Sequence, residues 1–296
     1  MATIRIQFTL FSAFYSPLIA TMAGGFLKEE GLEAEWSVSP KGVSAIRTVE
    51  AGGADLCQSA VSQGFGPAAQ SAGRGERPGA LHFAQINEMD GFFLTGRAPD
   101  PGFRWEKLEG AEVLLFRGGQ PLAMFRYACH KAGIDFDKLR VVNADDMDGA
   151  FRNGIGQYVQ QQGPAPQALE ADGVGHVVAE VGRQIGPVAF SSLAATPEWL
   201  GTDEARAFTR AYRKARAWLI ATPAAEVARA EKAFFPGTDT AVLARCIGAY
   251  QGLGCWTPHI EITRPAFETA QDVFQHAGQL PGRVRWEQVC CDPPDG

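Results

Sequence analysis

Apolar and polar residues alternate in blocks that predict strands and helices in turn along the first two thirds of the chain. In the first block, the apolar residues of positions 4–10 recur at every second residue, which is the period of a strand. A helix opened by Ser16-Pro17 and ended by Gly31 is expected next. Proline suits the first helical turn, and glycine suits the left-handed position past the last one. A second strand follows at once, so residues 3–36 are predicted to form a βαβ unit.

The same pattern predicts the remaining elements. Strands are expected over 80–86, 92–95, 113–116, 139–142, 158–160, 176–180 and 187–191, with one more that ends at Ser59. Helices are expected around 43–49 and from 60 toward 73, and a polar turn follows over 73–79. Two more helices are expected to end near residues 132 and 171. From residue 196 the spacing becomes helical, and helices are predicted over 202–222, 223–234, 238–252 and 264–277.

This order predicts an α/β fold with two lobes, in which the chain enters the second lobe near 88–97 and returns near 183–191. The expected division is residues 1–92 and 188–296 for the first lobe and 93–187 for the second. Parallel strands joined by helices leave their carboxyl ends and the helix N-termini at one edge of the sheet, where ligands bind. A small-molecule ligand is therefore expected in a cleft between lobes that close about a hinge.

The composition narrows the classes of partner. The formal net charge is −6 and no stretch is dense in lysine and arginine, so no nucleic-acid partner is expected. No apolar stretch reaches the roughly 18 residues that a membrane span needs. The chain has neither a Cys-x-x-Cys pair nor a His-Glu-x-x-His helix, so we expect no metal site and no cofactor.

The first residues, MATIRIQFTLF, are typical of a strand and not of a signal peptide. As given, the chain would therefore be cytoplasmic. A periplasmic location would hold if a leader had been removed from it.

Candidate ligand contacts follow the ends of the expected strands. The N–H groups of Gly118 and Gly119 could hold an anion at a helix start, although an ordinary strand–helix turn has the same sequence. Aromatic rings after the first strand could clamp a planar ligand or pack in the core, and Ser59 could contact the ligand, cap a helix, or do both. Gln161 and Gln162 could bond a neutral polar ligand or be solvated loop amides. No catalytic residue is expected, and the candidate ligand-binding residues are Phe11, Phe14, Tyr15, Ser16, Gly42, Ser44, Ser59, Ala60, Asp90, Gly118, Gly119, Gln120, Gln161, Gln162 and Ser191.

Segments spread over nearly the whole chain resemble one family. They include GFLKEEGLEAEW, GGADLCQS, EMDGFFLTGR, KLEGAEVLLFRGGQPLAMFRYACHKAGIDFDKLRVVN, GPVAFSSLAATPEWL and ARAFTRAYRKARAWL. Their order and spacing resemble the SsuA/THI5-like (NMT1-like) family of type II periplasmic binding proteins, the branch for nitrate, sulfonates, taurine and thiamine pyrimidines. The resemblance implies a protein that captures a small organic ligand, such as a sulfonate, a carboxylate or a heterocycle, for an ABC permease.

A leaderless enzyme of the same fold, acting on an aromatic or heterocyclic acid, stays open as the alternative. The resemblance extends to pyrimidine synthases and to decarboxylase- or desulfinase-like enzymes, which use a mid-chain cysteine cluster or a cysteine in the first loop. Here the loop at 11–16 has no thiol and no such cluster occurs. The turn Gln161-Gln162-Gly163-Pro164 also lacks the acidic residue of the family's Trp-Glu-Pro-like turn, which weakens the case for a cationic or amino-pyrimidine ligand.

Overall fold

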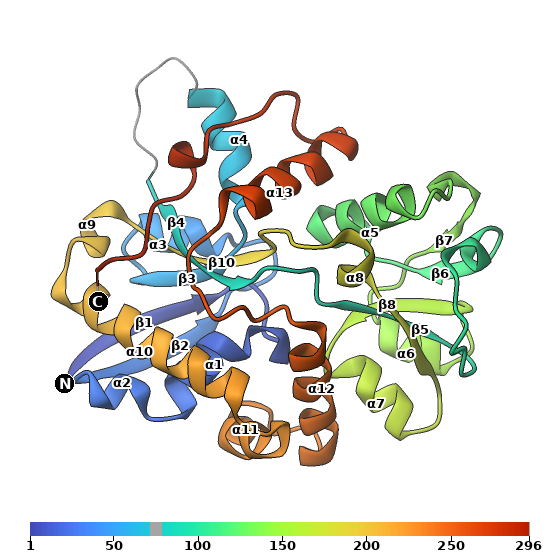
Figure 1. Cartoon of the computed structure of the whole chain (residues 1–296), viewed down its shortest axis with the longest axis horizontal. Helices are drawn as coiled ribbons and strands as arrows, with labels where there is room; N and C mark the ends of the chain where they lie inside the picture. The colour runs from blue at the N-terminus through green and yellow to red at the C-terminus, as the bar shows by residue number, and fades with distance from the viewer. Residues whose placement is uncertain (72–78, 296) are drawn as a thin grey trace.

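Two five-stranded sheets, each flanked by helices, make up the molecule (Figure 1). The computed structural model describes residues 1–71 and 79–295. Within these residues the first sheet has the strand order β2-β1-β3-β10-β4, and the second has the order β7-β6-β8-β5-β9. We call each sheet together with its helices a lobe.

The first lobe combines three parallel strands with two further strands. β1 pairs in parallel with β2 on one side and with β3 on the other, whereas β10 runs antiparallel to both β3 and β4. The strands are β1 (Ala2–Phe8), β2 (Leu32–Val38), β3 (Leu56–Ser59), β4 (Leu81–Asn87) and β10 (Ser191–Ala195). The helices are η1 (Ala13–Tyr15), α1 (Ser16–Ala23), α2 (Phe26–Glu29), α3 (Ala45–Glu50), α4 (Ser62–Ser71), α9 (Pro197–Leu200), α10 (Asp203–Ala221), α11 (Ala224–Glu231), η4 (Lys232–Phe234), α12 (Thr240–Leu253), α13 (Arg264–His276) and η5 (Trp286–Gln288).

The second lobe has the same mixed character. β5 runs antiparallel to β8 and β9, and β6 runs parallel to β7 and β8. The strands are β5 (Phe92–Gly96), β6 (Glu112–Leu114), β7 (Arg140–Val142), β8 (Tyr158–Gln162) and β9 (His176–Glu180). The helices are η2 (Trp105–Leu108), α5 (Gly119–Lys131), η3 (Phe136–Lys138), α6 (Met147–Arg152), α7 (Ala165–Ala171) and α8 (Val181–Ile185).

Two chain segments connect the lobes. The outward segment joins β4 to β5 through residues 88–91, and the return segment joins α8 to β10 through residues 186–190. The outward segment is tightly packed, because a Cβ atom at Gly91 would lie 2.1 Å from the Phe14 ring and a Cβ atom at Gly182 would lie 2.2 Å from the Asp90 carbonyl oxygen. Only glycine fits at these two positions.

The structure corrects two of the expected elements. The helix expected up to residue 30 is divided into α1 and α2, because Gly25 between them adopts a left-handed φ of 82°. The strand expected over 187–191 begins only at Ser191, since the N–H groups of residues 188 and 189 donate to the outward segment and to α13 and not to a strand. The turn expected over 73–79 falls, up to residue 78, outside the described residues.

Candidate ligand-binding site

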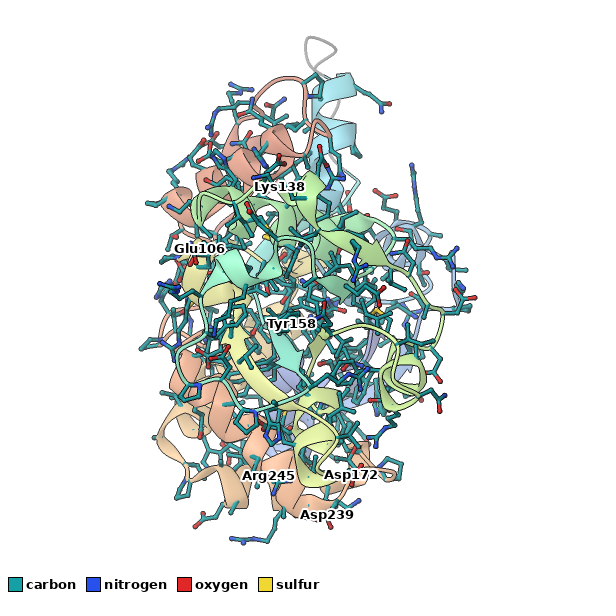
Figure 2. The ribbon with its side chains drawn as sticks, turned by 90° about the vertical axis from the view of Figure 1, so that its right-hand side faces the viewer. Glu106, Lys138, Tyr158, Asp172, Asp239 and Arg245 are labelled. Atoms are coloured by element: carbon teal, nitrogen blue, oxygen red, sulfur yellow. The ribbon has the colours of Figure 1, made fainter. Side chains whose placement is uncertain are left out.

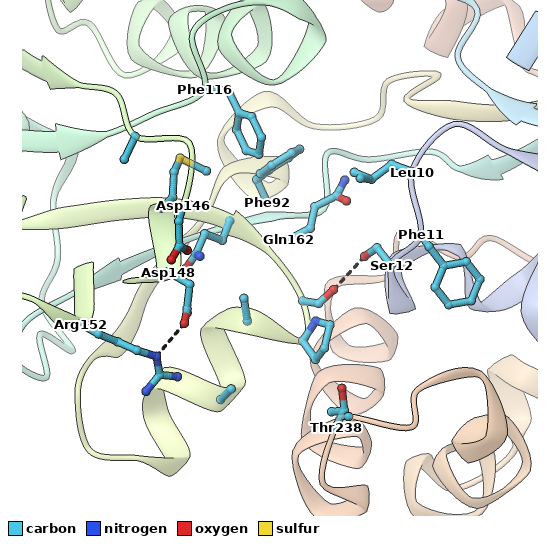
Figure 3. Close-up of a pocket in the computed structure, with 18 of the residues that line it drawn as sticks. Leu10, Phe11, Ser12, Phe92, Phe116, Asp146, Asp148, Arg152, Gln162 and Thr238 are labelled. Carbon is cyan, nitrogen blue, oxygen red and sulfur yellow. Dashed lines mark hydrogen bonds and ion pairs between the residues drawn. The ribbon is translucent and has the colours of Figure 1, made fainter. Parts of the chain in front are cut away.

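Two neighbouring cavities that share lining residues lie in the cleft between the lobes, and we call them the inner and the outer chamber. The inner chamber has a volume of about 390 Å³ and the outer one about 880 Å³. Leu10, Phe92 and Gln162 line both, and Figure 3 shows Gln162 at this junction with its amide toward Leu10. The other residues of the inner chamber are Thr9, Tyr15, Gly42, Val43, Ser44, Ala45, Gln58, Ser59, Ala60, Gln63, Gln120, Pro121, Phe190 and Ser191.

Three helices begin at the wall of the inner chamber. α3 is capped by Ser44, whose hydroxyl oxygen accepts a hydrogen bond from the Arg47 N–H at 3.4 Å, α4 begins at Ser62, and α5 begins at Gly119. The first N–H groups of a helix have no acceptor within the helix, and the aligned peptide dipoles place partial positive charge there. The starts of these helices therefore place partial positive charge near the chamber, while the N–H groups of Arg47, Gln63 and Gly64 already have acceptors within the protein.

The inner chamber presents more apolar than polar surface, and none of its lining residues, all from the described part of the chain, is charged. The protein itself orients two of the amides. Oε1 of Gln58 accepts hydrogen bonds from the N–H groups of Thr9 at 3.0 Å and Leu10 at 3.3 Å. Oε1 of Gln120 accepts one from the Ser62 hydroxyl at 2.7 Å. The NH₂ groups also donate within the protein, that of Gln58 to the Ser59 carbonyl oxygen at 3.4 Å and that of Gln120 to the Phe190 carbonyl oxygen at 2.8 Å. Each NH₂ group therefore has one hydrogen left that it can donate to a ligand.

Hydroxyl groups add further donors to this wall. The Ser191 oxygen accepts a hydrogen bond from the Asn87 side-chain amide at 2.6 Å, so that the Ser191 hydroxyl hydrogen is left for another acceptor. Burial raises the pKa of the Tyr15 phenol to about 12, with a smaller lowering by the Gln162 side chain and a smaller rise from Asp90. Tyr15 therefore keeps its proton and remains a donor at neutral pH.

Aromatic side chains form the apolar part of the inner chamber. Tyr15, Phe92 and Phe190 line it, and the ring centroids of Phe92 and Phe190 lie 6.2 Å apart. Phe14 lies behind them, fully buried, with its ring centroid 5.3 Å from that of Phe190 and 5.0 Å from that of Tyr250. Phe14 thus supports the aromatic wall from the core side.

The outer chamber is wider and has charged residues at its rim. Arg152 bonds to the carboxylates of Asp148 at 2.6 Å and Asp172 at 2.8 Å, and the first of these ion pairs is drawn in Figure 3. Asp172 of the second lobe and Asp239 of the first lobe both line this chamber and lie at the lower end of the molecule in Figure 2. Of the two chambers, as the described residues line them, only the outer one has charged lining residues.

A contact through Gly163 ties the two lobes together at the outer chamber. The Ser12 hydroxyl donates to the Gly163 carbonyl oxygen at 2.8 Å, and the Gly163 N–H donates to the Tyr250 hydroxyl oxygen at 2.8 Å. Tyr250 in turn donates to the Gly91 carbonyl oxygen at 3.1 Å. A Cβ atom at position 163 would lie 2.2 Å from the Cys246 sulfur, so this close approach requires glycine.

Most of the residues expected from the sequence line the cleft. In the inner chamber these are Tyr15, Gly42, Ser44, Ser59, Ala60, Gln120, Gln162 and Ser191. In the outer chamber they are Phe11, Gln161 and Gln162.

Five expected contacts line neither chamber. Phe14 belongs to the core, and Ser16 is buried and donates to a carboxylate of α11 at 2.7 Å. Asp90 is buried and accepts a hydrogen bond from the first N–H of β5 at 2.7 Å. Gly118 and Gly119 are exposed to solvent, and the φ of 71° at Gly119 is a backbone reason for glycine at that position. Each of these residues follows a strand end, but it lies in the core or at the solvent surface and not in the cleft. The sequence pattern does not show which of these places a residue takes.

Sequence reasoning missed Thr9, Gln58, Phe92 and Phe190. Gln58 directly precedes the expected contact Ser59. Its amide oxygen accepts hydrogen bonds from the N–H groups of Thr9 and Leu10, and the spacing of apolar residues in a strand does not predict these bonds. Phe190 lay inside the strand that the structure moves to Ser191.

Two buried carboxyl groups lie outside the chambers. Burial raises the pKa of Asp90 to about 8 and that of Glu231 to about 8, and a hydrogen bond to each lowers it by less. One oxygen of each carboxyl has no partner among the described residues. Burial therefore favours the protonated form of both groups. In the described part of the chain, no three side chains of the metal-binding types come together.

A cleft between two mixed α/β lobes is the architecture of solved substrate-binding proteins. The periplasmic aliphatic sulphonate binding protein SsuA from Escherichia coli superposes with a TM-score of 0.71 at 16% identity, over 99% of this chain and 93% of SsuA. The alkanesulfonate-binding protein SsuA from Xanthomonas axonopodis pv. citri, bound to MOPS, gives a TM-score of 0.68 at 17% identity over 96% of each chain. This likeness confirms the expected type II periplasmic-binding-protein fold.

The chain belongs to the NMT1/THI5-like family, whose family model matches residues 14–226. YtlA of Bacillus subtilis (strain 168), which is named as a binding protein, is 28% identical over 296 residues, covering 98% of this chain and 87% of YtlA. Family and neighbours together indicate a substrate-binding protein of the ABC type, as the resemblance implied. Within the residues described, we find no helix with the length and apolar character that crossing a membrane requires.

Proposed function

We propose that this substrate-binding protein captures a small organic anion, a sulfonate or a carboxylate, for uptake by an ABC permease. The observation that carries the proposal is the uncharged inner chamber, which has hydrogen-bond donors on Gln58, Gln120, Ser191 and Tyr15 and is lined by the second residues of α4 and α5. An acidic oxygen group accepts several hydrogen bonds at once, and bonds to a charged acceptor are about twice as strong as neutral ones.

The rest of the ligand would lie against Tyr15, Phe92 and Phe190. Their rings suit an aliphatic, aromatic or heterocyclic body, because flat apolar surfaces bury such groups without demanding a hydrogen bond. The inner volume of about 390 Å³ is at the small end of the roughly 300–1,000 Å³ common for small-molecule sites.

Binding would stabilise the closed cleft without covalent chemistry. Ser44 and Ser59 come from the first lobe, whereas Gln120 and Gln162 come from the second. A ligand that bonds to both sides has more contacts in the closed arrangement than in an open one, so it shifts the population toward closure. Closure then supplies the signal that a permease can recognise.

Matched pairs of compounds test the proposal. Thermal unfolding is measured with alkyl and aryl sulfonates and carboxylates, and with the neutral sulfonamide or carboxamide of the same skeleton. We expect at least one acid to raise the melting temperature while its neutral partner does not, since binding to the folded state alone stabilises it. Stabilisation by the neutral compounds, or by amines, with none from any acid would contradict the proposal.

A further inference from the structure

Gln120 is the inner-chamber residue whose side chain reaches from the second lobe to the first. It is the second residue of α5, and its amide lies between two groups outside its own lobe. Oε1 accepts a hydrogen bond from the hydroxyl of Ser62, the first residue of α4, at 2.7 Å. Nε2 donates to the carbonyl oxygen of Phe190 on the return segment at 2.8 Å. One amide thus bridges a helix start of the first lobe and the connection between the lobes.

The two bonds have a fixed direction. The Phe190 carbonyl can only accept, so the NH₂ side of the amide must face it, and the oxygen must face the Ser62 hydroxyl. This arrangement differs from the Gly163 contact, where the atoms of the second lobe belong to the backbone. At position 120 the interlobe contact depends on the identity of a side chain that also lines the chamber.

We infer that Gln120 is a positioning residue, which seats the second lobe over the inner chamber so that closure of the cleft depends on its amide. The inference rests on the proposed function only for the nature of the ligand that closure captures. Opening of the cleft separates the amide from Ser62, and closure re-forms that bond at the rim of the chamber. The second hydrogen of Nε2, which the Phe190 bond leaves over, adds a donor to the chamber in the closed state.

Replacing Gln120 by glutamate or by leucine separates the effect of the two hydrogen bonds from the effect of the size of the side chain. Gln120→Glu keeps the size of the side chain, but an ionised carboxylate cannot donate to the Phe190 carbonyl and faces it with like partial charge. Protonation restores one donor and one acceptor, so the variant should regain the hydrogen bonds to Ser62 and to the Phe190 carbonyl as the pH falls toward the ordinary glutamate pKa of about 4.3. Gln120→Leu removes both bonds at every pH. Gln275→Leu, on the exposed side of α13, is the matched control.

The first readout is the radius of gyration from small-angle X-ray scattering, measured without added anion at pH 8 and pH 4.5. We expect Gln120→Glu to be more expanded than the wild type at pH 8 and to approach it at pH 4.5. Gln120→Leu should be expanded at both, and the control at neither. A Gln120→Glu variant that matches the wild type at both pH values, or that fails to contract on acidification, would overturn the inference. Melting temperatures check that all variants fold.

The second readout is the affinity for MOPS, used as a probe sulfonate. If wild-type protein binds it, Gln120→Leu should weaken binding by about tenfold or more, through faster dissociation, because a donor and the closed state are both lost. Unchanged affinity in this variant would contradict the positioning role. If no sulfonate or carboxylate binds wild-type protein while the scattering results hold, the proposed ligand class is wrong and the role of Gln120 in closure stands.

Discussion

Gln58 and Gln120 illustrate how uncharged side chains can select a ligand of one sign. Their oxygens are bonded to the protein, to two backbone N–H groups in one case and to a serine hydroxyl in the other. Each NH₂ group makes one bond to a backbone carbonyl oxygen, so that one hydrogen of each is left for the ligand. A charged lysine or arginine would hold an anion more strongly, but a neutral donor set needs no desolvation of a cation before binding. At Glu231, by contrast, the side chain is ionisable, and burial favours its uncharged, protonated form.

Glu231 should make the stability of the protein depend on pH. Burial raises its pKa from 4.5 to about 8, so between these values the unfolded chain releases a proton that the folded protein keeps. The stability that Glu231 contributes is therefore fully present below pH 4.5 and falls as the pH rises toward 8, by up to about 1.4 kcal/mol per pH unit. Asp90, whose pKa is also raised, contributes the same trend to the wild type and to a variant at position 231. In Glu231→Gln, whose amide oxygen can still accept from Ser16, the fall due to Glu231 should be absent.

Urea unfolding of wild type and Glu231→Gln at pH 5, 6.5 and 8 measures the effect. We expect the stability advantage of the variant to grow with pH and to reach a few kcal/mol at pH 8. Glu226→Gln, at an exposed site of the same helix, is the control and should show no such trend. A difference that stays constant with pH would show that Glu231 is ionised in the folded protein.

At the scale of elements, α5 and α13 form a further contact between the lobes. The rings of His130 on α5 and His276 on α13 stack with centroids 4.5 Å apart, and Tyr127 packs edge-on against His276 at 5.8 Å. Burial lowers the pKa of His276, with further lowering by the nearby His130 and Arg126. Protonation of His276 therefore meets two basic neighbours, His130 and Arg126.

Acidification should weaken the α5–α13 contact. A depressed histidine pKa means that the unfolded chain binds the proton more readily, so this part of the stability is present above about pH 6.5 and is lost as the pH falls below it. His276→Phe keeps the stacked ring without the charge, and should lose less stability than the wild type between pH 7 and pH 5.5. Because His276 is exposed, solvent screening limits the difference to less than about 1 kcal/mol. Parallel acid dependence of the two melting temperatures would contradict this account.

At the scale of the whole molecule, the order of elements and the position of the cleft could be predicted from the sequence. The helices expected over 202–222 and 264–277 are α10 and α13, because their apolar residues recur at the helical period over several turns. Strand ends also pointed to the inner chamber through Ser44, Ser59 and Gln120. These features depend on local periodicity and on the rule that α/β folds bind ligands at strand ends.

The remaining features depend on contacts between distant residues. Gly24 and Gly25 did not indicate a break between α1 and α2, since isolated glycines also occur within helices. The return segment looked like a strand because residues 187–190 are apolar, but the N–H groups of residues 188 and 189 bond to the outward segment and to α13. Ser16 and Phe14 follow a strand end as binding residues do, and their burial in the core appears only when the later helices are in place.

The most direct test of the account is calorimetric titration of Gln58→Glu at pH 8 with an acid that stabilises the wild type. A glutamate at this position can still accept the N–H bonds of Thr9 and Leu10, but it replaces the donor in the chamber with negative charge. We predict that the acid binds at least about 100-fold more weakly than to the wild type, because a donor is lost and like charges meet in a site shielded from water. Gln275→Glu on the surface of α13 should bind as the wild type does. Undiminished binding to Gln58→Glu would show that the anion does not lie in the inner chamber.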